Sequence, residues 1–220
     1  MIVSIHQPAY IPWLGYFDKI AKSDVHIFLD DVLYSKNNLF NRNKIKTPNG
    51  WQWLTIPVRG HIHLPLNKII IDNTRNWQQQ HWTTIKLNYS RSKRFNKIAA
   101  ELEPLYQNSW EYLTDFNISM NRAISRILKI KTKFFQSSRL KVEGAGCQRL
   151  INLCRKFKAD TYLSGQGAKK SYMDEAMFKQ NGIEVIYQRF NPKPYDQLWG
   201  NYIPDLSILD NLFNSAQISL

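Results

Sequence analysis

Residues 2–31 read IVSIHQPAYIPWLGYFDKIAKSDVHIFLDD, and this stretch decides the fold. A short apolar run at residues 2–5 ends at a His-Gln-Pro turn, which predicts a strand. Apolar side chains at helical spacing over residues 13–21 predict a helix. Residues 25–29 are a second apolar run that ends at two aspartates. Strand, helix and strand in this order predict a βαβ unit, whose strands are parallel and connected with a right-handed crossover.

The rest of the chain repeats this alternation after an interruption. A polar stretch over residues 35–50 ends in Thr47-Pro48-Asn49-Gly50, a turn signal that favours a hairpin. Two or three helices are expected within residues 76–128, a mainly helical insert that would suit a lid or a dimer surface. Further strands are predicted at residues 51–58, 68–71, 133–136, 160–163 and 183–187. Further helices are predicted at residues 147–157 and 174–180.

The predicted fold is therefore a single α/β domain over residues 1–220. Its sheet should be mostly parallel and Rossmann-like, with helices on both faces, because alternating strands and helices form such layers. The two cysteines, Cys147 and Cys154, lie about two turns apart on one predicted helix, too far for a disulfide. We expect them to be buried or half-buried thiols.

A net charge of +13 calls for a polyanionic partner. Nucleic acid, an anionic membrane surface and a phosphorylated small molecule all fit that charge. Nucleic acid is disfavoured, because the basic residues are dispersed and no RNP-type motif, zinc finger or clean helix-turn-helix is present. The sequence contains no run of about 18 apolar residues, so no transmembrane helix is predicted. The N-terminus does not resemble a signal peptide, so a cytoplasmic location is expected.

Three polar segments follow predicted strands and predict a site at one edge of the sheet, outside the carboxyl ends of the strands. They are His6-Gln7-Pro8, Asp30-Asp31 and the segment that begins at Ser164. His6 is a candidate general base, since its ordinary pKa lies near neutrality; it could equally be a histidine that only bonds a loop. Asp30 and Asp31 are candidate catalytic residues that would orient the base, bind an amine or ribose hydroxyl, or hold a metal, and either could instead cap a turn.

Two segments are candidates for binding phosphate. Ser164-Gly165-Gln166-Gly167 should form a tight loop before a helix, where backbone N–H groups can surround a phosphate, and Lys169 would add charge. Asn41-Arg42-Asn43 is the second candidate, because arginine forms bidentate bonds to phosphate; otherwise this segment is a solvated loop.

The sequence resembles the WbqC-like family in several motifs that together span nearly the whole chain. They are residues 5–17 (IHQPAYIPWLGYF), 28–32 (FLDDV), 41–43 (NRN), 162–165 (YLSG) and 203–210 (IPDLSILD). The resemblance implies a role in bacterial surface polysaccharide biosynthesis, such as that of O-antigen in lipopolysaccharide. The implied reaction finishes a nucleotide-linked amino sugar with an acyl or aminoacyl group, for example glycyl.

A remoter resemblance is to nucleotidylyltransferases with an H-x-G-H loop after the first strand. Here Trp13-Leu14-Gly15-Tyr16 takes that place, so the glycine matches and both histidines are missing. Those histidines stabilise phosphates during adenylyl transfer. The resemblance therefore implies a nucleotide-binding architecture and argues against adenylyl transfer.

The leading hypothesis is a transferase that acylates the amino group of a nucleotide-diphosphate amino sugar. Gln7, Tyr10, Trp13 and Tyr16 would contact the substrate, with Tyr10 or Trp13 stacking on a base or sugar. The donor would be an acyl thioester or an acidic acyl-carrier protein, which suits a basic surface. The alternatives are a nucleotidyltransferase-like enzyme and a non-catalytic nucleotide-sugar binding protein.

Overall fold

The computed structural model describes residues 1–35, 38–59, 63–171, 173–215 and 218. By their contacts, these residues form two compact units, each built from several stretches of chain. Unit 1 contains residues 1–7, 15–31 and 130–191. Unit 2 contains residues 8–14, 32–129 and 192–220. None of the helices in the described ranges has the length and apolar character needed to cross a bilayer.

Unit 1 is built on a five-stranded, all-parallel sheet with the order β7-β2-β1-β8-β9. Its strands are β1 (Ile2–His6), β2 (Val25–Phe28), β7 (Lys133–Gln136), β8 (Thr161–Ser164) and β9 (Glu184–Tyr187). The predicted parallel pairing of the first two strands is confirmed, with Ile5 opposite Ile27. This is the α/β class with a Rossmann-like sheet that the sequence predicts.

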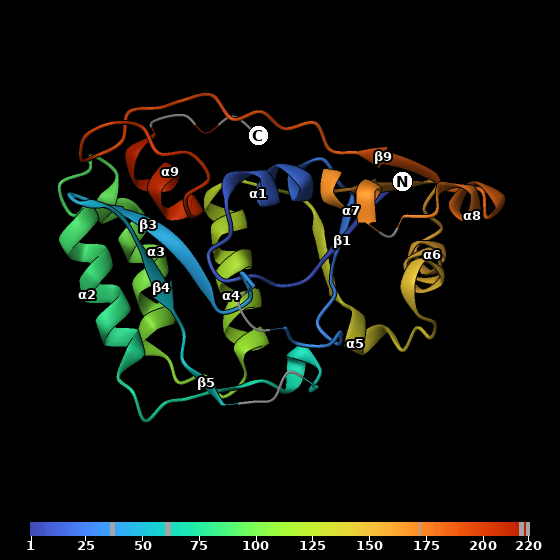
Figure 1. The fold of residues 1–220 in the computed structure, drawn as a ribbon, viewed down its shortest axis with the longest axis horizontal. Coiled ribbons are helices and arrows are strands. Elements are labelled where there is room, and N and C mark those ends of the chain that lie inside the picture. Colours follow the sequence, from blue (N-terminus) through green and yellow to red (C-terminus); the bar gives the residue numbers. More distant parts are fainter. Residues whose placement is uncertain (36–37, 60–62, 172, 216–217, 219–220) are drawn as a thin grey trace. The chain divides into compact units, whose positions relative to one another are not determined.

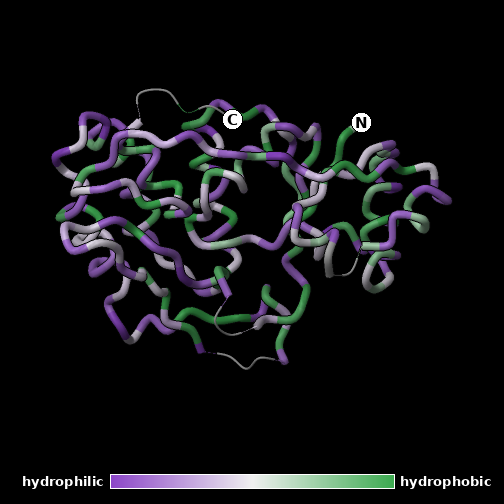
Figure 2. The backbone as a smooth tube through the Cα atoms, turned by 45° about the horizontal axis from the view of Figure 1, so that its top comes forward, coloured by the Kyte–Doolittle hydropathy of each residue, from purple (hydrophilic) through white to green (hydrophobic). Residues whose placement is uncertain are grey.

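Successive side chains of each strand point to opposite faces of this sheet. Helices cover both of these faces. The helices of unit 1 are α1 (Leu14–Ala21, of which Leu14 belongs to unit 2), α5 (Ser137–Leu140), α6 (Gly146–Lys156), α7 (Gln166–Ser171) and α8 (Glu175–Gln180). Val25 and Ile27 pack in one apolar cluster with residues of α6 and α8. His26 points to the other face, where its ring lies 5.8 Å from that of Tyr16 on α1. In Figure 2 the chain is drawn as hydrophobic where it starts, as expected for β1.

Unit 2 contains the predicted hairpin, formed by β3 (Arg42–Thr47) and β4 (Gly50–Thr55), which run side by side in Figure 1. Gly50 has a φ of +109°, a conformation that favours glycine, so glycine is the residue that this position after the turn requires. A second small pair, β5 (Val58–Arg59) and β6 (Ile70–Ile71), flanks a short 3-10 helix at Leu66–Lys68.

The stretch from residue 76 to 128 forms three helices, α2 (Trp77–Tyr89), α3 (Phe95–Gln107) and α4 (Leu113–Ile127). Aromatic rings fill the space between them, with Trp77 5.2 Å from Phe116 and 6.2 Å from Tyr106. Helix α9 (Ile208–Asn214) adds Phe213, whose ring lies 5.0 Å from that of Tyr89. These rings form the core of unit 2.

Two segments that the sequence predicts as loops are regular structure. Arg42, Asn43 and Lys44 belong to strand β3, because the tight turn at Pro48-Asn49 pairs them with β4. In Ser164-Gly165-Gln166-Gly167 only Gly165 lies between strand and helix, since Ser164 still pairs with Tyr187 and α7 begins at Gln166. The predicted loop at residues 164–167 is therefore reduced to Gly165, and the alternative reading of residues 41–43 as a solvated loop is wrong for Arg42 and Asn43.

Candidate functional site

The strand order of unit 1 creates a switch point between β1 and β8. From β1 the chain moves to β2 and β7 on one side, and then returns to β8 and β9 on the other. At such a point the crossovers leave in opposite directions, which opens a crevice at the carboxyl ends of the strands. His6 ends β1 and Ser164 ends β8, so two of the residues singled out from the sequence flank this point on neighbouring strands.

His6 is held at the end of β1 by the Gln7 carbonyl oxygen and the ring of Tyr16. Its Nδ1 lies 3.0 Å from the Gln7 carbonyl oxygen, which also accepts a hydrogen bond from the Tyr16 hydroxyl at 3.2 Å. The rings of His6 and Tyr16 meet edge to face at 5.0 Å. A carbonyl can only accept, so Nδ1 carries the proton and Nε2 remains the acceptor of the neutral ring.

Buried polar groups continue from His6 along the face of the sheet under α1. Ser4 and His26 are fully buried and joined through Oγ and Nδ1 at 2.8 Å. Lys19 of α1 is only 3% exposed. Burial lowers the pKa of the Lys19 ammonium group to about 7, because a charge loses its hydration there.

Burial and the nearby Lys19 charge act together on the two histidines. They lower the pKa of His6 to about 3, although the Gln7 carbonyl works in the opposite direction. They also hold the pKa of His26 well below its ordinary range, with a small contribution from His6. Both imidazoles are therefore neutral at pH 7.

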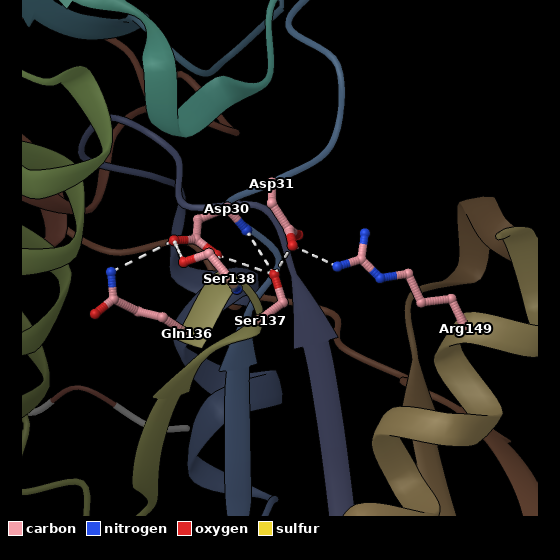
Figure 3. A network of polar contacts seen from close by, with 6 residues as sticks. All are labelled: Asp30, Asp31, Gln136, Ser137, Ser138 and Arg149. Atoms are coloured by element: carbon pink, nitrogen blue, oxygen red, sulfur yellow. Dashed lines mark hydrogen bonds and ion pairs between the residues drawn. The ribbon is translucent and has the colours of Figure 1, made fainter. Parts of the chain in front are cut away.

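The two aspartates after β2 belong to a hydrogen-bonded network that ties β2 to β7 and α5 (Figure 3). Asp30 is 1% exposed and accepts hydrogen bonds from the Ser137 hydroxyl at 2.9 Å, the Ser138 amide at 2.9 Å and the Ser138 hydroxyl at 2.7 Å. Its carboxylate also lies 3.4 Å from the Gln136 amide nitrogen. Asp30 thus satisfies the amide of Ser138 in the first turn of α5 and fixes that helix at the sheet edge.

Asp31 lies on the other side of Ser137 and is paired with Arg149 of α6. Its Oδ1 is 2.6 Å from the Ser137 hydroxyl, and its Oδ2 receives the Arg149 guanidinium group. The single hydroxyl proton of Ser137 serves one carboxylate at a time, so the two aspartates share it. Nowhere in the described ranges do three or more His, Cys, Asp or Glu side chains gather as metal ligands.

The segment after β8 presents a short helix rather than an extended loop. Ser164 is buried and its hydroxyl lies 3.5 Å from the Gly165 carbonyl oxygen. Lys169 of α7 is exposed, with its ammonium nitrogen 5.0 Å from the Tyr187 ring centre. Lys169 therefore places a positive charge on the helix that follows β8.

The other predicted ligand residues belong to unit 2, where several bind the backbone. Tyr10 is fully buried, and its hydroxyl lies 2.9 Å from both His81 Nδ1 and the Tyr106 hydroxyl. Asn41 donates from its amide to the Ile56 carbonyl at 2.9 Å. Asn43 donates to the carbonyls of residues 10 and 11 at 3.2 and 2.9 Å, so both of its amide protons are used within unit 2.

Arg42 and Trp13 are half-buried in unit 2. Arg42 lies on the outer face of the hairpin, with its guanidinium carbon 4.6 Å from the Trp53 ring centre. Trp13 lines a pocket of about 20 Å³ with Tyr195 and Tyr202, which is room for one water molecule.

Sequence reasoning missed four residues of this edge: Lys19, Ser137, Ser138 and Arg149. The signal for Ser137 and Ser138 was present, since they directly follow a correctly predicted strand. Lys19 stands three residues after Tyr16, on the apolar stripe of its helix, and its burial follows from that spacing. No local signal marks Arg149.

One comparison with known proteins names a family. The model of the WbqC-like protein family matches residues 7–220. The chain is 40% identical over 216 residues to the uncharacterized protein Rv1507c of Mycobacterium tuberculosis (strain ATCC 25618 / H37Rv), covering 96% of this chain and 93% of that protein. No solved structure matches. Because the family model matches nearly the whole chain, the chain belongs to the WbqC-like family.

Proposed function

We propose that this protein transfers an acyl or aminoacyl group to the amino group of a nucleotide-diphosphate amino sugar used for surface polysaccharide. The observation that carries the proposal is the switch point of unit 1, with the neutral His6 ring at the end of β1 and Lys169 on the helix after β8. Doubly wound sheets bind nucleotides at this point, and a basic chain suits a diphosphate. Membership of the WbqC-like family supports the same reading.

In the proposed reaction the sugar amine attacks the carbonyl carbon of a thioester donor. A C–N bond forms, the C–S bond breaks, and the thiolate leaves. His6 Nε2 takes the proton that the amine loses and passes it to the departing thiolate. Lys169 holds the diphosphate, and the Asp31–Arg149 pair keeps the neighbouring strand end in place.

The low pKa of His6 describes the protein without ligand. A base with a pKa of about 3 is weak at neutral pH. A diphosphate close to His6 would favour the protonated ring and raise this pKa, because opposite charges stabilise each other in a buried site. Substrate binding would thus activate the base, and an empty site would stay inactive.

Ligand binding is the first test. In a thermal-shift screen, nucleoside diphosphates and diphosphate amino sugars should raise the midpoint, since a ligand at 100 times its dissociation constant adds about 2.7 kcal/mol of stability. Lys169→Ala should weaken this binding, and the loss should shrink at high salt. Triphosphates that bind only with Mg²⁺ would instead favour nucleotidyl transfer.

Kinetics on an accepted amino sugar nucleotide test the base. His6→Ala should lower kcat by about 10²- to 10⁴-fold and leave substrate binding nearly unchanged, because a base acts mainly in the transition state. The matched control is His63→Ala, which removes an exposed histidine of unit 2 and should keep full turnover. Full turnover in His6→Ala would refute the role of His6 and make Asp31 the base to test.

A further inference from the structure

The outer face of the β3–β4 hairpin combines exposed tryptophans with cations. Trp51 is 45% and Trp53 is 37% exposed, which is unusual for the largest apolar side chain. The pairing register puts Lys44 opposite Trp53. The Lys44 ammonium nitrogen lies 4.1 Å from the Trp51 ring centre and 5.2 Å from that of Trp53. Arg42 lies over Trp53 on the same face.

The inner face of the hairpin explains why these rings stay outside. Asn43, Ile45 and Leu54 point inward and are buried in unit 2. Lys46 departs from the alternation, because its ammonium group is buried against Gln197 and Asn201. The outer face therefore includes Arg42, Lys44, Trp51 and Trp53, a set that we call the hairpin face.

The stretch of chain that carries the hairpin face is rich in basic residues. Residues 32–71 contain no aspartate or glutamate in a chain that has 17 of them. The same stretch contains six basic residues: Lys36, Arg42, Lys44, Lys46, Arg59 and Lys68. Arg59 is paired with Asp72 and Lys46 is buried near Asp210, so Arg42 and Lys44 supply the positive charge beside the two rings, and this charge favours anions.

We propose that the hairpin face docks on the headgroup region of an anionic phospholipid membrane. Tryptophan suits that region because its ring is apolar and its N–H group can stay hydrated. Lysine and arginine beside the rings would pair with anionic headgroups while their aliphatic stems stay in apolar contact. The protein would then lie on the membrane surface and not in it.

Ring geometry favours a membrane over single-stranded nucleic acid. Successive bases stack on open ring faces, whereas Trp51 and Trp53 meet at 83° with cations over their rings. Headgroup insertion needs no parallel rings, only amphipathic side chains at one depth. The hairpin face meets that requirement.

Vesicle co-sedimentation tests the proposal with the full chain. Wild type should bind vesicles of phosphatidylglycerol and phosphatidylcholine, should bind pure phosphatidylcholine at least tenfold more weakly, and should dissociate as salt rises. Lys44→Gln should weaken binding about fivefold, the equivalent of about 1 kcal/mol for a lysine near an anionic surface. Trp51→Ser with Trp53→Ser should weaken it further and abolish fluorescence quenching by brominated acyl chains.

The control removes one apolar side chain and one lysine elsewhere in unit 2. Leu87 is 73% exposed on α2 and Lys97 is exposed on α3, so Leu87→Gln with Lys97→Gln should bind like wild type. Circular dichroism melting checks that each variant is folded. If the double tryptophan variant does not fold, Lys44→Gln still tests the proposal, because it keeps both rings. Equal binding to both vesicle types, equal losses in the control, or preferential binding of single-stranded RNA by the same residues would overturn the proposal.

Discussion

Lys19 is a cation held inside unit 1 with almost no access to water. No hydrogen bond to its ammonium group is found within the described ranges, and burial brings its pKa to about 7. Its charge also contributes to the low pKa of His6 and His26. Because the pKa of Lys19 is about 7, its charge changes with pH near neutrality. The basicity of His6 changes with it, since the Lys19 charge lowers the pKa of His6.

Lys19→Met should flatten the pH dependence of stability between pH 7 and 8.5. The folded-state pKa of Lys19, about 7, lies below its ordinary value of 10.5, so the unfolded chain binds more protons in this range. Wild-type stability therefore rises with pH by up to about 1.4 kcal/mol per pH unit, and this slope disappears without Lys19. Urea unfolding at several pH values measures it.

The control is Lys22→Met. Lys22 lies on the exposed side of the same turn, with a half-exposed side chain paired to Asp18 at 2.6 Å. This variant should keep the wild-type slope. A wild-type slope in Lys19→Met as well would contradict the assignment.

Helix α5 shows at the level of an element how Asp30 acts. Four residues are too few to form a stable helix alone, because nucleation costs more than one turn returns. Asp30 accepts hydrogen bonds from Ser137 and Ser138 and anchors this turn at the end of β7. We infer that Asp30 positions the edge of the sheet.

Asp30→Ala should lower the free energy of unfolding by about 2–4 kcal/mol, because it removes the acceptor of the partly buried Ser138 amide and hydroxyl and one of the two acceptors of Ser137. Asp174→Ala is the matched comparison, since Asp174 caps α8 through one bond to the Met177 amide and should cost about 1 kcal/mol. Urea unfolding measures both. Similar losses in the two variants would show that the Asp30 network contributes no more than an ordinary cap.

On the scale of the whole molecule, both units bury histidines in the neutral form. His6 and His26 belong to unit 1, and His81, whose pKa burial lowers to about 4, belongs to unit 2. All three depend on exclusion of water from the interior. Acid should therefore act on both units together.

Stability should fall as the pH decreases from about 6.5 to about 4. The folded-state pKa of each buried histidine lies below 6.5, so the unfolded chain binds more protons and each contributes up to about 1.4 kcal/mol per pH unit. His81→Gln should remove one such contribution, and His63→Gln, which replaces an exposed histidine, is the control. Urea unfolding at pH 5 and 6.5 compares them, and an unchanged slope in His81→Gln would contradict the prediction.

The sequence by itself determined the elements and their local order. Alternating apolar runs indicated the β1-α1-β2 unit, and Thr47-Pro48-Asn49-Gly50 indicated the hairpin, because both signals act between residues close in the chain. Polar residues after strands also identified His6, Asp30 and Ser164 as residues of one sheet edge. These inferences need only periodicity and the direction of parallel strands.

Only the tertiary structure decided what those residues contact. Asp30 meets Ser137 from 107 residues away and Asp31 meets Arg149 from 118 residues away, separations that no local pattern encodes. The motif at residues 5–17 is also divided between the two units, with His6 in unit 1 and Tyr10 buried in unit 2. Burial sets the charge of Lys19 and His6, and burial results from the packing of segments that are far apart in the sequence.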